Sequence, residues 1–571
     1  MVQRKLHNSL STTGLHNRSF DYPIIAKKGE DGLSQRDDCL PERGPLSDRL
    51  DVAIRKKGFE VNCAPPNTFD NIAERHFLKF LRPLHREFTP RQQSLISQRQ
   101  DNLAESLEGR KPTHPLPSAI THGKWRINLP DWCCDQRNQM TGPADDAELI
   151  VKMLNSGAPG VMLDLEDSMV NQWTHQKRAV ENILQALEGK VSYYDEKIKT
   201  QVRIEAWPVI WIRPRGLHLS QQGVLEDGEL LSASLFDVAR IAFHVNPEHL
   251  KHPLSIYIPK SESAEEALWW RDLFQSLAKA LDWPKDYIKC MALVESHPLA
   301  FQMEQFLFNL RDHIVGLNLG RWDYMASLIH FHLDDPNWVL PDRNSIPHDV
   351  PFFQNLRQLM VEICHKRGVL AIGGMTALYP SRRDERLNAR ALEVLASDKK
   401  NEADCLMDGA WTGHPDQNQI AIAQFPFPNQ GFARLRGSNP CPNMRPEPKG
   451  VGQRTLTGTR TAIRTVIRYR NGVLNGKGAS LIDGYMEDLA TDRIYRLMIA
   501  QRVKHNRQAP IIDEALAPVP HTPKLITQLF DEELDKLISD RARTELGSTE
   551  TLREARDIGE SMIANEEVTP I

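Results

Sequence analysis

Two carboxylates, Glu295 and Asp323, each follow a short apolar run of the kind found in buried strands. Two carboxylate ligands leave room for waters and substrate oxygens, an arrangement that suits Mg²⁺. Either acid could instead pair with a nearby Lys or Arg, or cap the helix that follows it. The residue types therefore allow a magnesium site without establishing one.

Arg213, in WIRPRGLHL, also follows an apolar run. Its planar guanidinium could hold a carbonyl oxygen that becomes negative during a reaction. It could equally form an ion pair with Asp164 or Glu166, and the two roles are compatible. Asp488, in YMEDLATDR, lies in a helical pattern that by itself indicates only an acid at a helix start.

Other polar residues carry weaker signals. His218 and His414 are predicted to be structural residues or to support a site through its ligands, and not to be metal ligands themselves, because neither has a second His or Cys at metal-ligand spacing. Lys260 could contact a phosphate or close a salt bridge, and its position does not rank these alternatives. The sequence has no Walker-type or GxGxxG loop, so a nucleotide-binding fingerprint is absent.

From about residue 123, short apolar runs alternate with helical stretches, which predicts an α/β fold with a parallel sheet. Seven runs are candidate strands, and the segment near residue 406 is an eighth. The seven are GVML (160–163), VIWI (209–212), RIAFHV (240–245), SIYI (255–258), CMALV (290–294), HIVGLNL (313–319) and VLAI (369–372). Eight such strands would close a TIM (β/α)8 barrel.

In a TIM barrel the active site lies at the C-terminal ends of the strands. Ionisable residues gather at or directly after the ends of these runs. They are Asp164, Glu166, Asp167, Arg213, Arg215, His244, Lys260, Glu262, Glu295, Arg321 and Asp323. We therefore expect the active site at that mouth of the barrel.

The remaining sequence divides into flanking regions. Residues 1–70 are polar and irregular, and residues 71–122 have helical spacing. The barrel is predicted over 123–424. Six prolines within 425–450 indicate a linker or long loop, and 451–571 is predicted to be a helical domain.

Bulk properties favour a folded protein that acts on small molecules. The 571 residues carry a formal charge of -4, which gives no sign of nucleic-acid binding. No run approaches the roughly 20 apolar residues of a membrane helix, and no secretory signal is evident. The eight cysteines lack CxxC spacing and the chain ends in Thr-Pro-Ile, so we expect reduced thiols and a cytoplasmic protein. The oligomeric state is not predicted.

Several long segments occur together and in order: LNSGAPGVMLDLEDSMVNQW, WIRPRGLHL, SLFDVARIAFH, YIPKSES, ALVESHPLAFQMEQFLFNLRDHIVGLNLGRWDYM, CHKRGVLAIGGM, GAWTGHP and GYMEDLATDR. Their series resembles the malate synthases and is collinear from about His76 to about Lys504. The resemblance implies a TIM barrel with an N-terminal helical clasp and a C-terminal helical plug. It also implies a condensation of acetyl-CoA with glyoxylate, followed by hydrolysis of malyl-CoA to malate and CoA.

The resemblance assigns roles residue by residue. It makes Glu295 and Asp323 the Mg²⁺ ligands, Arg213 the group that polarises glyoxylate and steadies the enolate, and Asp488 the base. Asp164 and Glu166 match acids near the metal waters and the arginine.

The resemblance also indicates where the substrates bind. Gly320 and the peptide N–H groups of Trp322 and Asp323 fall where the glyoxylate carboxylate is held. Pro415, in GAWTGHP, is predicted to contact acetyl-CoA.

Some positions depart from the family pattern: Leu217 where Trp is usual, residues 134–140 where a more basic stretch is common, and Ala410 and Gly413. These changes leave a different 2-oxo acid open as substrate. A malyl-CoA or citramalyl-CoA lyase is the rival enzyme, although such chains are generally shorter and lack the plug. An inactive scaffold relative is disfavoured because the four proposed catalytic and metal residues are all retained.

Overall fold

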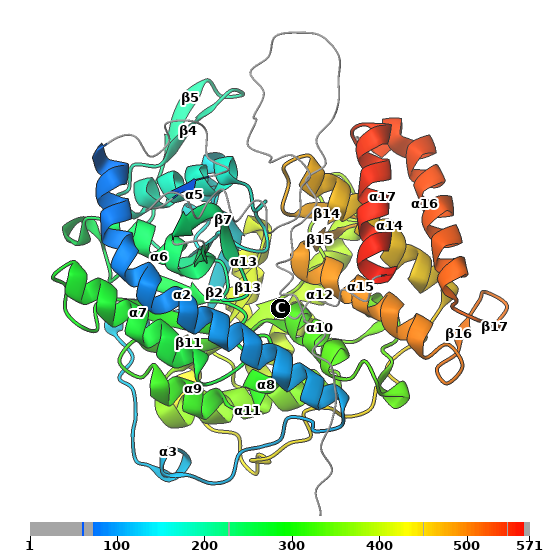
Figure 1. The fold of residues 1–571 in the computed structure, drawn as a ribbon, viewed down its shortest axis with the longest axis horizontal. Coiled ribbons are helices and arrows are strands. Elements are labelled where there is room, and N and C mark those ends of the chain that lie inside the picture. The colour runs from blue at the N-terminus through cyan, green and yellow to red at the C-terminus, as the bar shows by residue number, and fades with distance from the viewer. Residues whose placement is uncertain (1–59, 62–71, 227–228, 449, 545, 565–571) are drawn as a thin grey trace, which may run out of the picture.

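The computed structural model describes residues 60–61, 72–226, 229–448, 450–544 and 546–564 (Figure 1). Most of the segment predicted to be irregular, 1–70, lies outside the described residues. Its described part is the short strand β1 (Glu60–Val61), which pairs with β7 (Ser220–Glu226). β7 in turn pairs with β8 (Glu229–Ser232) to complete a small three-stranded sheet.

Eight parallel strands close into a barrel, as the sequence predicted. In spatial order they are β10 (Lys289–Val294), β11 (Ile314–Leu319), β12 (Leu370–Met375), β13 (Gly409–Thr412), β2 (Asn138–Pro143), β3 (Gly160–Asp164), β6 (Val209–Arg213) and β9 (Ser255–Ile258). Apolar residues fill both faces of most strands, because the barrel interior and the outer helices exclude water from both sides. The fold is therefore a TIM barrel.

One predicted strand was wrong and one real strand was missed. RIAFHV (240–245) forms the end of helix α6 (Ala233–His244), which is buried over most of its length, so its apolar run imitated a strand. His244 ends that helix and does not follow a barrel strand. The missing strand is β2, whose sequence NQMTGP contains no continuous apolar run.

The polar residues of β2 have partners inside the barrel. Gln139 accepts hydrogen bonds from the Tyr257 hydroxyl at 2.9 Å and from the Trp411 indole at 2.8 Å. Its amide donates to Gln136 at 2.9 Å, and the same Gln136 oxygen accepts from Trp211 at 3.0 Å. A buried polar side chain is tolerated when it is paired in this way, so β2 needs no apolar pattern.

Most barrel helices pack an apolar face against the strands and expose a polar face. Besides α6, the barrel helices are α4 (Ala147–Leu154), α5 (Trp173–Leu187), α7 (Glu266–Ala280), α8 (His297–Ala300), α9 (Met303–Asn309), α10 (Arg321–Phe331), α11 (Pro351–Arg367), α12 (Glu385–Asp404) and α13 (Pro415–Gln424). Helices α6, α8 and α10 are instead buried over nearly their whole length. Strands β4 (Ser192–Asp195) and β5 (Thr200–Arg203) form a projecting hairpin (Figure 1).

The long helix α2 (Ile72–Leu107) crosses the barrel and packs against α6 and α7 (Figure 1). Its Arg99 donates to both carboxylate oxygens of Glu266 at 2.8 and 2.6 Å and to the backbone oxygen of Lys260 at 2.7 Å. The short helix α3 (Ala119–His122) follows along the chain. Helix α2 thus holds the loop that follows β9.

A second helical unit lies beside the barrel (Figure 1). It contains α14 (Leu456–Leu474), β14 (Ser480–Ile482), β15 (Tyr485–Glu487), α15 (Leu489–Lys504), β16 (Ile511–Ile512), β17 (Pro518–Val519), α16 (Pro523–Thr544) and α17 (Thr549–Ala564). Helix α15 packs on α10 of the barrel. The Pro-rich stretch before this unit contains one short helical segment, Pro428–Phe432, within its described residues. In the described part of the chain no helix is long and apolar enough to span a membrane.

Candidate active site

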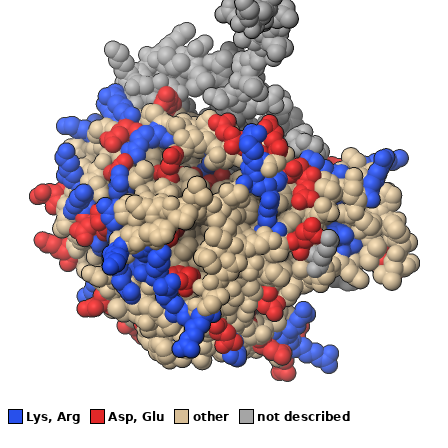
Figure 2. Space-filling view, turned by 90° about the horizontal axis from the view of Figure 1, so that it is seen from below, with Lys and Arg blue, Asp and Glu red and all other residues tan. Residues whose placement is uncertain are grey.

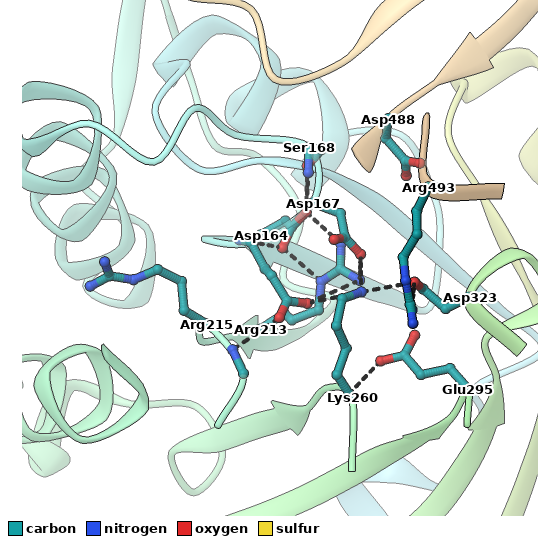
Figure 3. A network of polar contacts seen from close by, with 12 residues as sticks. Asp164, Asp167, Ser168, Arg213, Arg215, Lys260, Glu295, Asp323, Asp488 and Arg493 are labelled. Atoms are coloured by element: carbon teal, nitrogen blue, oxygen red, sulfur yellow. Dashed lines mark hydrogen bonds and ion pairs between the residues drawn. The ribbon is translucent and has the colours of Figure 1, made fainter. Parts of the chain in front are cut away.

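Five of the predicted site residues lie together at the C-terminal mouth of the barrel (Figure 3): Asp164, Arg213, Glu295, Asp323 and Asp488. Arg215 points away from them and pairs with Asp237. Asp164 ends β3 and Arg213 ends β6, where the two residues lie opposite each other in the parallel register. Glu295 follows β10 directly, and Asp323 lies in the first turn of α10 after β11. The strand ends therefore supply most of the site, as expected for a TIM barrel.

Arg213 is held by carboxylates on the neighbouring strand. Its Nε and Nη2 donate to the two Asp164 oxygens at 2.7 and 2.6 Å, and its Nη1 donates to Asp167 at 3.1 Å. Burial by itself would raise the pKa of Asp164, but Arg213 lowers it overall. The ion pair considered from the sequence is therefore present, and it fixes the guanidinium at the mouth.

Lys260 links the acids of the site. Its Nζ donates to Asp167 and Asp323, both at 2.8 Å, while its backbone N–H donates to Glu295. The sequence left open whether Lys260 contacts a phosphate or forms a salt bridge, and in the structure it forms salt bridges. The φ of Lys260 is +45°, an uncommon conformation for a residue with a side chain. Backbone strain of this kind is often found at functional sites.

The two predicted metal ligands differ in their electrostatic surroundings. Burial raises the pKa of Glu295 to about 8, and the nearby Asp323 adds to the shift. Burial also favours the neutral form of Asp323, but Lys260 and Arg493 outweigh it and lower its pKa. Gly320 permits the close approach of this loop, because a Cβ there would lie 2.6 Å from Glu295 Oε2.

The acids of the mouth fit a hard divalent cation. Asp323 Oδ1, Asp167 Oδ1 and Glu166 Oε2 are buried and have no hydrogen-bond partner. Cations lie at longer range, with Lys260 Nζ 3.6 Å from Glu166 Oε2 and Arg493 Nη1 3.8 Å from Asp323 Oδ1. Buried carboxylate oxygens without a hydrogen bond are costly unless a metal cation or water binds them. Among the described residues, no group of three or more His, Cys, Asp or Glu side chains is arranged to hold a metal. Two carboxylates with waters and substrate oxygens would still suit Mg²⁺, which seldom has an all-protein cage.

Asp488 comes to the mouth from the second helical unit (Figure 3). It is the N-cap of α15 and accepts from Thr491 N at 3.3 Å, while its own N–H donates to Thr491 Oγ1 at 2.9 Å. The sequence interpretation of a helix-start acid is thus correct but incomplete. Burial, together with the charges of Asp167 and Asp323, raises the pKa of Asp488 to about 7. A carboxylate with this pKa can act as a base near neutral pH.

The start of α10 offers donors to an anion. Gly320 precedes the helix, and Trp322 and Asp323 lie in its first turn, where backbone N–H groups have no partner within the helix. Pro415 begins α13 directly beyond β13, at the same end of the barrel. His414 accepts a hydrogen bond from Asp416 N at 3.1 Å as the N-cap of α13, the structural role predicted for it.

Two arginines at this mouth were not singled out as functional from the sequence. Arg493, on α15, brings Nη1 to 3.8 Å from Asp323 Oδ1. Arg343, in the loop between α10 and α11, contacts both Trp322 and the second helical unit. Arg343 lies in none of the segments that carry the resemblance. Arg493 is the last residue of GYMEDLATDR, but the motif does not indicate its contact with Asp323, which joins segments far apart in the sequence.

The fold is that of a TIM-barrel enzyme, in which a carboxylate from a separate helical unit faces a buried cluster of acids. Three family models match the chain: the malate synthase N-terminal domain at residues 57–112, the TIM barrel domain at 209–431 and the C-terminal domain at 453–569. The chain belongs to the malate synthase family.

Similar curated proteins span most of this chain. Malate synthase A of Escherichia coli (strain K12) is 34% identical over 81% of the chain and 87% of its own length. Malate synthase of Myxococcus xanthus (strain DK1622) is 33% identical over 85% of the chain and 90% of its own length. The glyoxysomal malate synthase of Gossypium hirsutum is 31% identical over 81% and 84%, respectively.

Proposed function

We propose that the protein condenses acetyl-CoA with glyoxylate and hydrolyses the resulting malyl-CoA to malate and CoA. The observation that carries this proposal is the meeting of Asp488 with Arg213, Glu295 and Asp323 at one barrel mouth (Figure 3). A carbon acid as weak as the acetyl methyl needs both a base and a positive group for the enolate that forms. Asp488 supplies the base and Arg213 the positive group.

Asp488 takes the proton from the methyl group of acetyl-CoA. Its raised pKa makes it a stronger base than an ordinary carboxylate while leaving much of it ionised near pH 7. Arg213 donates to the enolate oxygen and then to the aldehyde oxygen of glyoxylate. Asp164 keeps the guanidinium in a fixed orientation, so little reorganisation is needed as charge develops.

Glu295 and Asp323 would hold Mg²⁺, which when bound supplies Lewis-acid polarisation of the substrate oxygens. Lys260 would keep both acids oriented, since it contacts Asp323 through Nζ and Glu295 through its backbone N–H. Glu166 has a buried oxygen without a hydrogen bond and would accept from waters bound to the metal.

The N–H groups at the start of α10, at Trp322 and Asp323, bind the glyoxylate carboxylate beside Gly320. The N-terminus of a helix favours anions at this position. Pro415 contacts acetyl-CoA at the opening.

We assign no nucleic-acid or membrane partner, and the oligomeric state is left open. We place the protein in the cytoplasm, whereas the Gossypium relative is glyoxysomal.

The test is release of the CoA thiol from acetyl-CoA, measured with and without glyoxylate and in Mg²⁺ or EDTA. Release that requires glyoxylate and Mg²⁺ supports the proposal. A protein that instead only cleaves supplied malyl-CoA into acetyl-CoA and glyoxylate is a lyase. A protein that acts faster with another 2-oxo acid than with glyoxylate has a different substrate.

The pH dependence of kcat should follow the ionisation of Asp488. A base works only when ionised, so kcat should fall about tenfold per pH unit below the pKa of Asp488, which is raised to about 7. Bound Mg²⁺ adds positive charge, which shifts this midpoint downward. Steady-state rates at saturating substrates from pH 5 to 9 measure it. A kcat that stays flat down to pH 5 contradicts a base of raised pKa.

A further inference from the structure

Arg343 connects the barrel to the segment that carries Asp488. It begins a short helical turn, Arg343–Ser345, in the loop between α10 and α11, and only 3% of it is exposed. Its Nη1 donates to the two Glu487 oxygens at 2.7 and 2.9 Å and to the Tyr495 hydroxyl at 2.9 Å. Glu487 directly precedes Asp488, so this ion pair reaches the base through one peptide bond.

The same guanidinium also packs on Trp322, in the first turn of α10, where the glyoxylate carboxylate is proposed to bind. Its carbon lies 4.5 Å from the centroid of the Trp322 ring and 5.2 Å from that of Tyr495. A guanidinium packed on aromatic rings is attracted by their faces, and this attraction strengthens when water is excluded. Arg343 therefore lies between Trp322 of α10 and Glu487 of β15.

The neighbouring residue makes a second link to the same helical unit. Asp342 accepts from Arg502 Nη2 at 2.6 Å and from Thr455 N at 3.1 Å. Thr455 is the N-cap of α14 and Arg502 lies in α15. Two consecutive barrel residues thus fasten the unit at two places, and the Arg343 contact is the one nearer to Asp488.

We propose that Arg343 is a positioning residue, which through Glu487 fixes the base Asp488 relative to Trp322 and the proposed glyoxylate site at the start of α10. The inference rests on the proposed function, because it takes Asp488 as the base. Arg343 has no contact with a reacting atom in this assignment. Its effect is geometric: misplacement of a catalytic group by about 1 Å can cost about 100-fold in rate.

A buried ion pair between two units could also serve only to hold them together. That role lowers the unfolding temperature but leaves kcat of the folded enzyme unchanged. The positioning role lowers kcat and makes proton abstraction more strongly rate-limiting. The deuterium isotope effect on kcat with methyl-deuterated acetyl-CoA separates the two roles, since it rises only when abstraction slows.

The experiment compares Arg343→Met, Glu487→Gln and the double variant with the wild type, all as the full-length protein in Mg²⁺. We expect kcat to fall about 30- to 100-fold, KM for acetyl-CoA to stay within about threefold, and the isotope effect to increase. The double variant should be no slower than the slower single variant, because both remove one interaction. If Arg343→Met does not fold, Arg343→Lys keeps the charge but loses the planar guanidinium that packs on Trp322 and Tyr495, and should give an intermediate loss.

Arg240→Met is the matched control. Arg240 also pairs with a carboxylate from another unit, Glu74 of α2 at 2.6 Å, and packs on Phe77 at 5.3 Å from the ring centroid. It lies near the end of α6, away from the mouth, so its loss should reduce stability and leave kcat and the isotope effect unchanged.

Two outcomes separate this inference from the function on which it rests. If folded Arg343→Met and Glu487→Gln keep wild-type kcat and isotope effect while Asp488→Asn is inactive, the positioning role is wrong and the base assignment stands. If Asp488→Asn keeps wild-type kcat, the base assignment fails and the inference fails with it.

Discussion

Asp488→Asn is expected to lower kcat by about 10³-fold, within the range that general-base catalysis contributes. Asparagine cannot accept the methyl proton at neutral pH. It is nevertheless a good N-cap, so the contact with Thr491 at the start of α15 should persist and the protein should stay folded. Because the side chain keeps its size, acetyl-CoA binding should change little. Steady-state kinetics and calorimetric titration with acetyl-CoA measure the two effects.

Asp146→Asn serves as its control. Asp146 is the N-cap of α4 and accepts from Leu149 N at 3.0 Å, so the substitution makes the same chemical change at another helix start. Its kcat should equal that of the wild type. A wild-type kcat in Asp488→Asn would remove this residue from the mechanism, and the search for a base would turn to Glu262, whose pKa is raised to about 7 by burial.

The strands that the sequence predicted correctly share one physical feature. GVML in β3 and CMALV in β10 are buried on both faces, so they are continuous apolar runs of strand length. The error at α6 has the same origin, since a helix buried on nearly all sides loses its polar face and its 3.6-residue period. Strand β2 could not be found this way, because Gln139 accepts hydrogen bonds from Tyr257 and Trp411, which lie far from it in the sequence.

The residues that the barrel brings to the mouth were easier to predict from the sequence than those that the second helical unit brings. Arg213, Glu295 and Asp323 follow strands, so the barrel rule alone brings them together once the strands are known. Asp488 comes from another unit, and only the family resemblance pointed to it. Arg343 had no signal, because its role depends on Glu487 being brought to it by the docking of the second unit.

The site also combines two requirements that oppose stability. Buried acids at the mouth must remain available to a cation and a substrate, so some of their oxygens accept no hydrogen bond from the protein. The consequence appears in their pKa values: burial favours the neutral form of Glu295 and Asp488, and neighbouring carboxylates add to the effect. Sequence spacing carries no information on these shifts, because they depend on which charges meet after folding.

Loss of a carboxylate at the proposed metal site should have the other large effect. Glu295→Gln and Asp323→Asn are each expected to weaken Mg²⁺ binding by about 100-fold or more, since even an outer partner of a metal ligand contributes about 10- to 100-fold. Activity at low Mg²⁺ should fall accordingly. Calorimetric titration with Mg²⁺, and CoA release over a range of Mg²⁺ concentrations, measure the two effects.

Glu304→Gln is the control for these variants. Glu304 is mostly buried and accepts from Arg367 Nε at 2.7 Å, but it lies on α9, outside the acid cluster. Its loss should lower stability without changing Mg²⁺ affinity. Wild-type Mg²⁺ affinity in both Glu295→Gln and Asp323→Asn would show that these acids are not the ligands.

Glu295→Gln should also show that this acid destabilises the metal-free protein while serving metal binding. The pKa of Glu295 is raised by burial to about 8 in the folded state, against about 4.3 in the unfolded chain. The unfolded state therefore releases the proton first, and Glu295 makes the wild-type protein progressively less stable as pH rises from about 4 to 8. Glutamine has no such charge, so the variant in EDTA should gain in Tm relative to wild type between pH 5 and pH 8. Added Mg²⁺ should reverse the order, because it stabilises the wild type more than the variant. An unchanged order would mean that the acid is retained for a reason other than metal binding.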